Sequence, residues 1–174
     1  MRNGTIVQML SVLAFVLMFV TGCSDKDYEP YETDANMTTI QTYLEKEFKG
    51  PGSELIGAFE KEDPYPPELQ AYVEKNYTPL VANTEQFLNK NHILLYLRFA
   101  HENGYKLNTK SIHIERIDDN QVNAFNYEAE VNYSKNGKTN TATVTGRMNI
   151  NDNGKISIIR NIDDGGLLEK LNQK

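Results

Sequence analysis

The stretch FNYEAEVNYSKNGKTNTATVTGRM, residues 125–148, decides the fold because it reads as two strands of alternating residues around a tight turn. Asn136-Gly137 is the strongest two-residue signal for a hairpin turn, and it sets Lys135 opposite Lys138. The resulting register gathers apolar residues on one face, in the pairs Val131 with Ala142, Ala129 with Val144, Tyr127 with Gly146 and Phe125 with Met148. Alternate positions, such as Glu128 opposite Thr145, are polar. The sequence therefore predicts a hairpin with one packed and one polar face.

A strand before this hairpin extends the apolar face. If Asp119-Asn120 forms a second two-residue turn, Ile114 pairs with Phe125 and Ile112 pairs with Tyr127. Both pairs join apolar residues, so we expect this strand to lie beside the hairpin with its isoleucines on the packed face.

A fourth strand follows the hairpin. A two-residue turn is rejected there, because it would set Ile150 against Ser157. A three-residue loop at 152–154 instead sets Ile150 against Ile156 and Met148 against Ile158, with Gly154 in the left-handed position that such loops prefer. The sequence thus predicts a four-stranded antiparallel meander over residues 110–162.

Arg160 breaks the pattern of this meander, because the predicted register places it on the packed face opposite Gly146 and near Tyr127. A cation on a packed face must reach a partner or water. Arg160 could anchor a pocket between sheet and helices, lined also by Tyr127 and Tyr133. Alternatively, it is an arginine whose head group reaches water near the strand end, or the register slips locally.

The half of the chain before the sheet is predicted to be helical. Apolar residues recur every three or four positions at Met37, Ile40, Leu44 and Phe48, which is typical of an amphipathic helix. Asn36 or Thr38 can cap its start, and Gly50-Pro51 ends it. Further helices are expected to begin at Ser53, Pro67 and Thr78-Pro79, with a core stripe of Phe87, Leu88, Leu94, Leu95, Phe99 and Ala100. Helices followed by a meander packed on them predict an α+β domain.

The N-terminus carries an apolar stretch, residues 6–20, that is long enough for a signal sequence but short of the roughly 20 residues that span a membrane. Val20-Thr21-Gly22-Cys23 follows it and resembles the bacterial lipobox. The resemblance implies cleavage before Cys23, which then carries S-diacylglycerol and an N-acyl group. The alternative is an uncleaved N-terminal anchor with an incidental cysteine.

The lipobox divides the chain into three segments. Residues 1–22 form the predicted lipoprotein signal peptide, residues 23–36 the lipidated cysteine and an acidic tether, and residues 37–174 a single α+β domain. Low hydrophobicity and repelling charges are typical of an extended segment such as the tether. We therefore expect a protein anchored by lipid at the extracytoplasmic face of the cell membrane.

Charge and composition exclude several classes of partner. The net charge of −6 excludes a nucleic-acid partner, which would require a basic face. One cysteine allows neither an intrachain disulfide nor a cysteine-based metal site. His92 and His101 lack the spacing of a helical metal pair, and the calcium-like start at 149–154 has Arg160 where a glutamate ligand is needed. We expect neither a metal nor a cofactor.

The order of elements, and the closing strand GKISIIR at 154–160, resemble the cystatin-like roll of the nuclear-transport-factor-2-like superfamily. Small Gram-positive lipoproteins of unassigned function often have this layout. The resemblance covers about residues 37–165 and implies a curved sheet and helices that enclose a pocket. Some members are enzymes, often with a His–Asp pair inside the cone, and others bind ligands or partners. His113 falls on the polar face in the predicted register and does not supply such a pair.

The sequence contains no phosphate-binding loop, zinc-protease motif or nucleophile elbow. Its function is therefore interpreted as a non-enzymatic binding or interaction module, with the membrane as one partner, through the lipid anchor, and an unknown protein or small molecule as the other. The alternative is a small-ligand-binding pocket or a hydrolase-type enzyme around Arg160, Tyr127 and Tyr133.

Overall fold

The computed structural model describes residues 34–117 and 123–173. Cys23, the lipobox, the signal peptide and nearly all of the tether lie outside the described residues, so these assignments stay predictions. None of the helices in the described ranges is long and apolar enough to cross a membrane.

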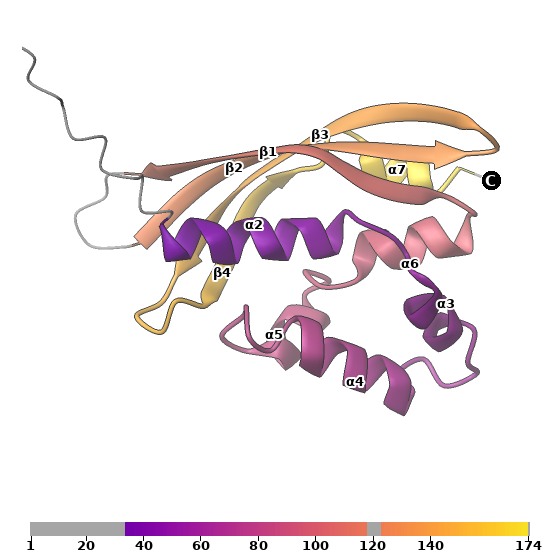
Figure 1. Ribbon diagram of the computed structural model, residues 1–174, viewed down its shortest axis with the longest axis horizontal. Coiled ribbons are helices and arrows are strands. Elements are labelled where there is room, and N and C mark those ends of the chain that lie inside the picture. Colours follow the sequence, from indigo (N-terminus) through magenta and orange to yellow (C-terminus); the bar gives the residue numbers. More distant parts are fainter. Residues whose placement is uncertain (1–33, 118–122, 174) are drawn as a thin grey trace, which may run out of the picture. The chain divides into compact units, whose positions relative to one another are not determined.

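Helices precede the sheet, as the sequence predicts. The elements in chain order are α2 (Ala35–Glu47), α3 (Ser53–Phe59), α4 (Pro67–Asn76), α5 (Thr84–Asn89), α6 (Leu95–Glu102), β1 (Lys106–Ile117), β2 (Asn123–Lys135), β3 (Lys138–Ile150), β4 (Ile156–Asp163) and α7 (Leu167–Leu171). The antiparallel strands have the order β1-β2-β3-β4. Helices α2 to α6 lie on one side of the sheet, here called the inner side, and none of these helices lies on its other side, here called the outer side (Figure 1). The α+β prediction is confirmed.

Helix α2 begins two residues earlier than expected. The side chain of Asp34, rather than Asn36 or Thr38, caps the helix by accepting a hydrogen bond of 2.9 Å from the Asn36 N–H. A carboxylate at this position also interacts favourably with the positive end of the helix dipole. Asp34 forms an ion pair with Arg116, and this contact joins the start of α2 to the end of β1.

The helix expected to restart at Thr78-Pro79 is absent, and α5 begins at Thr84 instead. The segment before it pairs with the sheet, because the Ile156 N–H donates to Leu80 O and the Ala82 N–H donates to Ile156 O, both at 2.8 Å. These bonds use backbone groups that a helix would need. At the opposite edge of the sheet, Gly50 exchanges two backbone hydrogen bonds with Leu107 at the start of β1.

The predicted hairpin is confirmed in full register. Lys135 pairs with Lys138, Tyr127 with Gly146 and Phe125 with Met148. The core lies between the inner face of this hairpin and the helices, and its members with no more than 1 % exposure include Ile40, Leu44, Leu55, Leu69, Val73, Leu97, Phe125, Ala129, Val131, Val144, Met148, Leu167 and Leu171.

The pairing of β1 with β2 differs from the prediction by two residues. Ile114 pairs with Tyr127 and Ile112 with Ala129, so a two-residue turn at Asp119-Asn120 is wrong. Residues 118–122 lie outside the described ranges, but the longer connection is clear from the register. A shift of two keeps each side chain on its expected face, because strand side chains alternate with a period of two.

The last hairpin follows the prediction only at its start, where Ile150 pairs with Ile156. The register then shifts by one residue between Asn149 and Ile150, so Met148 pairs with Ile159 rather than with Ile158. Ile159 is 8 % exposed and belongs to the core, whereas Ile158 is 47 % exposed. This bulge reverses the faces of Ile158, Ile159 and Arg160. A second register shift follows between Thr145 and Arg147 of β3, after which Asp163 pairs with Thr145.

Candidate functional site

The bulge moves Arg160 away from the position that the sequence predicted. Arg160 pairs with Arg147, not with Gly146, and its side chain is exposed on the outer side of the sheet. Its Nη2 donates to Asn149 Oδ1 at 3.4 Å. The placement on the packed face was wrong, and the local register slip is the reading that holds.

The other two predicted pocket residues also lie apart. Tyr133 pairs with Leu107 near the hairpin end of β2, and its ring contacts that of Tyr105 at 6.1 Å between centroids. Tyr127 lies nearer the middle of β2 and is 5 % exposed. The structure therefore brings neither Tyr133 nor Arg160 to the cavity that Tyr127 lines.

That cavity, here called the Glu47 pocket, lies between α2, the α5–α6 connection and the inner side of the sheet. Its volume is about 240 Å³. Its lining combines aromatic and aliphatic side chains with one carboxylate: Tyr43, Leu44, Glu47, Phe48, Lys90, Asn91, His92, Leu95, Tyr96, Tyr127, Val144, Ile159 and Ile162.

Glu47 is the ionisable group at the centre of this lining. It comes from the last turn of α2 and is only 3 % exposed. Its Oε1 accepts a hydrogen bond of 3.1 Å from the Leu94 N–H. Burial raises the pKa of Glu47 to about 7, although the nearby Tyr77 hydroxyl and the Leu94 N–H both act to lower it. A carboxyl with this pKa changes its charge near neutral pH.

The backbone opposite Glu47 adopts an unusual conformation. Asn91 and Leu94 have positive φ values of 56° and 69°. For leucine this region is sterically unfavourable by roughly 1–2 kcal/mol. Two contacts with α2 hold the turn: Leu94 N–H donates to Glu47, and the Tyr43 hydroxyl donates to the carbonyl of His92. The α5–α6 connection is therefore fixed against the pocket by side chains of α2.

Tyrosines form much of the wall. Burial raises the pKa of Tyr43, Tyr96 and Tyr127, and the negative charge of Glu47 raises each of them further. These phenols therefore stay protonated and neutral at neutral pH. The wall presents aromatic rings and hydroxyl groups to the cavity, and Glu47 supplies its negative charge.

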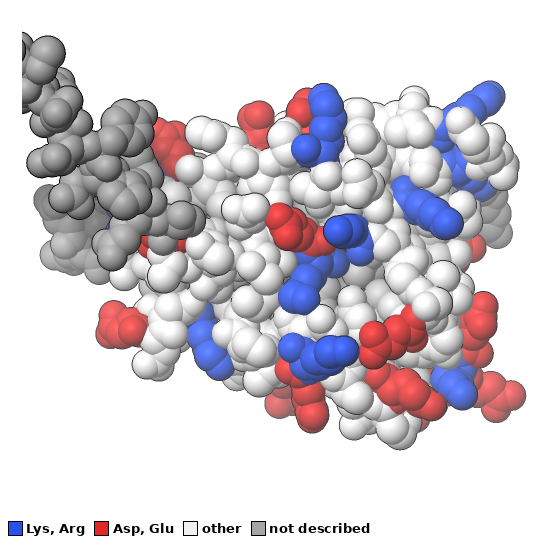
Figure 2. Space-filling model, in the orientation of Figure 1, with Lys and Arg blue, Asp and Glu red and all other residues white. Residues whose placement is uncertain are grey.

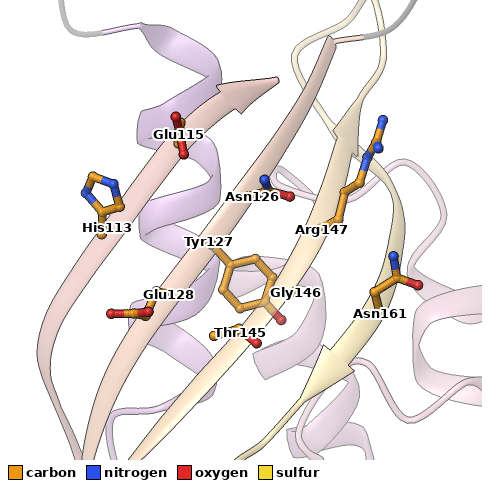
Figure 3. A pocket seen from close by; sticks show the side chains of 9 residues that line it. All are labelled: His113, Glu115, Asn126, Tyr127, Glu128, Thr145, Gly146, Arg147 and Asn161. Atoms are coloured by element: carbon orange, nitrogen blue, oxygen red, sulfur yellow. The ribbon is translucent and has the colours of Figure 1, made fainter. Parts of the chain in front are cut away.

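Gly146 determines where the ring of Tyr127 lies. A Cβ at Gly146 would come within 2.6 Å of the Tyr127 hydroxyl oxygen and 2.8 Å of its ring carbons. The ring therefore occupies the space that a side chain on β3 would fill, as the close-up shows (Figure 3). Glycine is needed here because of this close approach and not because of its backbone angles.

Among the described residues, no hydrogen bond or ion pair joins His92 to Glu47. Burial, and then the charge of Lys90, lower the pKa of His92, whereas an adjacent carboxylate would raise it. No group of three metal-ligating side chains occurs within residues 34–117 and 123–173. The chemistry of the pocket therefore centres on one carboxyl surrounded by phenols.

A second concavity, here called the outer hollow, lies on the outer side of the sheet and has a volume of about 360 Å³. Residues from all four strands line it: His113, Glu115, Asn126, Tyr127, Glu128, Thr145, Gly146, Arg147 and Asn161 (Figure 3). Acidic side chains come from β1 and β2, and Arg147 comes from β3. His113 lies here, on the polar face, as the predicted register required.

Charges of both signs are also mixed on the view of the molecule in Figure 2, where acidic side chains gather near α3 and α4. Basic side chains are interspersed and form no continuous patch in that view. On the face drawn in Figure 2, the described basic side chains thus form no stripe of the kind that a nucleic-acid-binding face presents.

The structure defines an α+β protein with helices on one side of an open four-stranded antiparallel sheet. No protein-family model matches the chain, and no curated protein matches it. Its fold is similar to that of the putative transfer protein TraH from the Gram-positive conjugative plasmid pIP501, solved in solution by NMR. The TM-score is 0.52 at 12 % sequence identity, and the match covers 76 % of this chain and 95 % of TraH. At this identity the likeness concerns the fold alone.

Glu47 was not among the residues that the sequence singled out. The signal was present, because Glu47 lies three positions after Leu44 and seven after Ile40, on the buried stripe of α2. A charged residue on an apolar stripe requires a partner or a function.

Proposed function

We propose that the mature protein is a lipid-anchored, extracytoplasmic, non-enzymatic module that docks a protein partner on the outer hollow. The sequence Val20-Thr21-Gly22-Cys23 supports the anchor, with diacylglycerol and N-acyl groups on Cys23. Stable anchoring requires two acyl chains, which the diacylglycerol alone would supply. The membrane would then be the first partner of the chain.

The observation that carries the docking proposal is the outer side of the sheet, on which none of helices α2 to α6 lies. Helices α2 to α6 lie on the inner side, whereas the outer side presents a hollow lined by all four strands (Figures 1 and 3). Interfaces of this kind combine a concave surface with polar groups that can be satisfied by a partner.

Charge favours a protein as the occupant. The hollow carries Glu115 and Glu128 on one side and Arg147 on another. Nucleic acids and anionic lipid headgroups present one sign of charge, whereas a protein surface can match both. The likeness in fold to TraH, a putative transfer protein of a conjugative plasmid, also favours a protein partner. We infer that the fold of this chain serves as a contact module.

A hydrolase-type enzyme is the second candidate, and the pKa of Glu47 near neutrality favours it, because a general acid or base works best there. Two observations argue against an enzyme. The phenols around Glu47 stay neutral, and the pKa of His92 is lowered by burial and Lys90 rather than raised by Glu47. The pocket around Arg160, Tyr127 and Tyr133 gives no further support, since the three side chains lie apart.

The anchor is tested by metabolic labelling with palmitate. Label should enter the wild-type protein but not Cys23→Ser, and the mature wild-type chain should begin at Cys23. Incorporation into both proteins, or an intact residue 1–22 segment, would contradict lipidation at this cysteine.

The docking surface is tested by site-specific photo-cross-linking in intact membranes. A photoreactive residue at Asn126, inside the hollow, should give one discrete protein adduct, identified by mass spectrometry, that disappears on Glu128→Lys. The matched control is Asn108, which is exposed on β1 outside the hollow. Equal adducts from both positions, or none from Asn126, would exclude the outer hollow as the docking site.

A further inference from the structure

The Glu47 pocket contains a negative charge that a purely structural role does not require. If Glu47 served only to hold the α5–α6 connection, a glutamine would suffice, because its amide oxygen can accept the same Leu94 N–H. Glutamine would also avoid the cost of burying a carboxylate, which amounts to several kcal/mol for an unpaired ion. The ion pairs recorded among the described residues join other groups and leave Glu47 without a cationic side chain.

The walls around Glu47 are suited to a cation with alkyl groups. Tyr43, Phe48, Tyr96 and Tyr127 line the cavity, and the rings of Phe48 and Tyr96 lie 5.1 Å apart. Faces of such rings attract cations, most strongly where water is excluded. Leu44, Val144 and Ile159 complete the lining with apolar surface.

The composition of the cavity disfavours an inorganic ion. Calcium and magnesium prefer six or more oxygen ligands, and the described lining offers one carboxylate among rings and aliphatic side chains. The volume of about 240 Å³ suits a molecule smaller than most drugs. A compact organic ion fits both observations.

We propose that the Glu47 pocket binds a small organic ammonium ion, with its positive charge paired to the Glu47 carboxylate and its alkyl groups against the rings of Tyr43, Tyr96 and Tyr127. This site shares Tyr127 with the outer hollow but otherwise has its own lining, and it does not depend on the docking function.

The rim of the pocket is compatible with such a ligand. Lys90 and Asn91 are exposed there, and Ile162 is 43 % exposed. Lys90 extends into solvent, where water screens its repulsion. His92 adds no second positive charge at neutral pH, because burial and Lys90 lower its pKa.

Binding should strengthen as pH rises through neutrality, because burial raises the pKa of Glu47 to about 7 and the ion pair requires the ionised form. The groups that face Glu47 keep one charge over this range: Tyr43, Tyr72, Tyr77, Tyr96 and Tyr127 all have raised pKa values and stay neutral. The pH dependence of binding therefore reports on Glu47.

The test compares choline with its uncharged carbon isostere, 3,3-dimethyl-1-butanol, on the full chain purified in a non-ionic detergent. Calorimetry should detect choline binding to the wild type and a loss of at least about tenfold in affinity for the isostere, since one ion pair of modest strength corresponds to that factor. Glu47→Gln should lose at least about tenfold in choline affinity while keeping the cooperative unfolding of the wild type.

Glu128→Gln is the matched control, because it removes one carboxylate from the outer hollow, and its choline affinity should equal that of the wild type. Tyr96→Leu tests the wall separately and should weaken choline binding several-fold. Equal binding of choline and the isostere, full choline affinity in Glu47→Gln, or failure of choline, tetramethylammonium and putrescine to bind at millimolar concentrations would each overturn the proposal.

Discussion

Two glutamates on opposite sides of the sheet have pKa values that are shifted in opposite directions. Glu47 enters the inner side, where burial raises its pKa to about 7. Glu130 lies on the outer side of β2, where a hydrogen bond from Ser111 and an ion pair with Lys110, at 2.7 and 3.1 Å, lower its pKa. The inner side suppresses charge, whereas the outer side stabilises it. A cationic ligand would therefore favour the ionised form of Glu47, whereas Glu130 already has a cationic partner in Lys110.

The largest difference between the two sides is expected in the effect of alanine substitutions on stability, at two neighbouring residues of β2. Phe125 is fully buried on the inner side and lies under the guanidinium of Arg116, which is 4.8 Å from its ring centre. Phe125→Ala should reduce the free energy of unfolding by about 3–5 kcal/mol, because it removes a large side chain from a close-packed core. Denaturant unfolding measures this change.

The control for this prediction is Asn126→Ala, whose side chain is exposed on the outer side. Its effect should stay within about 0.5 kcal/mol. Comparable losses at both positions would mean that the outer side is covered in the native protein.

The next contrast concerns the buried charge. In the native state the pKa of Glu47 is about 7, whereas its ordinary value is 4.5. Between these two pH values the native state therefore binds more protons than the unfolded state. The stability of the wild type should therefore fall as pH rises through this window. Glu47→Gln removes this loss and should exceed the wild type by on the order of 3 kcal/mol above about pH 8. Thermal unfolding at several pH values measures the difference.

Glu130→Gln should show the opposite sign. Its lowered pKa means that the wild-type carboxylate contributes stability above its ordinary pKa, and this contribution is lost as pH falls through the folded value. A difference between Glu47→Gln and wild type that is independent of pH would argue against a buried ionised carboxylate in the pocket.

The smallest of the three effects on stability is expected beside Tyr127, which lines both the Glu47 pocket and the outer hollow. Gly146→Ala places a methyl group against the ring of Tyr127 and should destabilise the fold by about 1–3 kcal/mol, as overpacking does. It should also weaken choline binding, because the ring must move. Gly57→Ala is the control: it lies within α3 with open space at its Cβ position, and it should stabilise by about 0.5–1 kcal/mol. Unfolding curves of the two variants should shift in opposite directions.

The central hairpin was predictable because Asn136-Gly137 fixes the register from a local signal. The last hairpin was not, because Ile156, Ile158 and Ile159 allow two alternations of buried and exposed positions. Helix packing selects Ile159 over Ile158, and alternation along one strand contains no information about that choice.

The candidate site was largely beyond sequence reasoning. Tyr127 was singled out only as a neighbour of Arg160 in a register that proved wrong, although Tyr127 does line the cavity. Glu47 was missed, since its role depends on Leu94, which is distant in the sequence and has a backbone conformation that leucine rarely adopts. Arg160 drew attention only because the bulge beside Asn149 was not foreseen.

The two strand-like contacts outside the sheet have a consequence for self-association. Edge strands with free backbone groups can pair with strands of other molecules and so start aggregation. Here Gly50 occupies the first residues of the β1 edge, and the segment around Val81 occupies the start of β4. Each edge is thus closed at its first residues by the chain's own backbone. These contacts shorten the length of each edge that another molecule could pair with, which disfavours edge-to-edge association at the start of β1 and of β4.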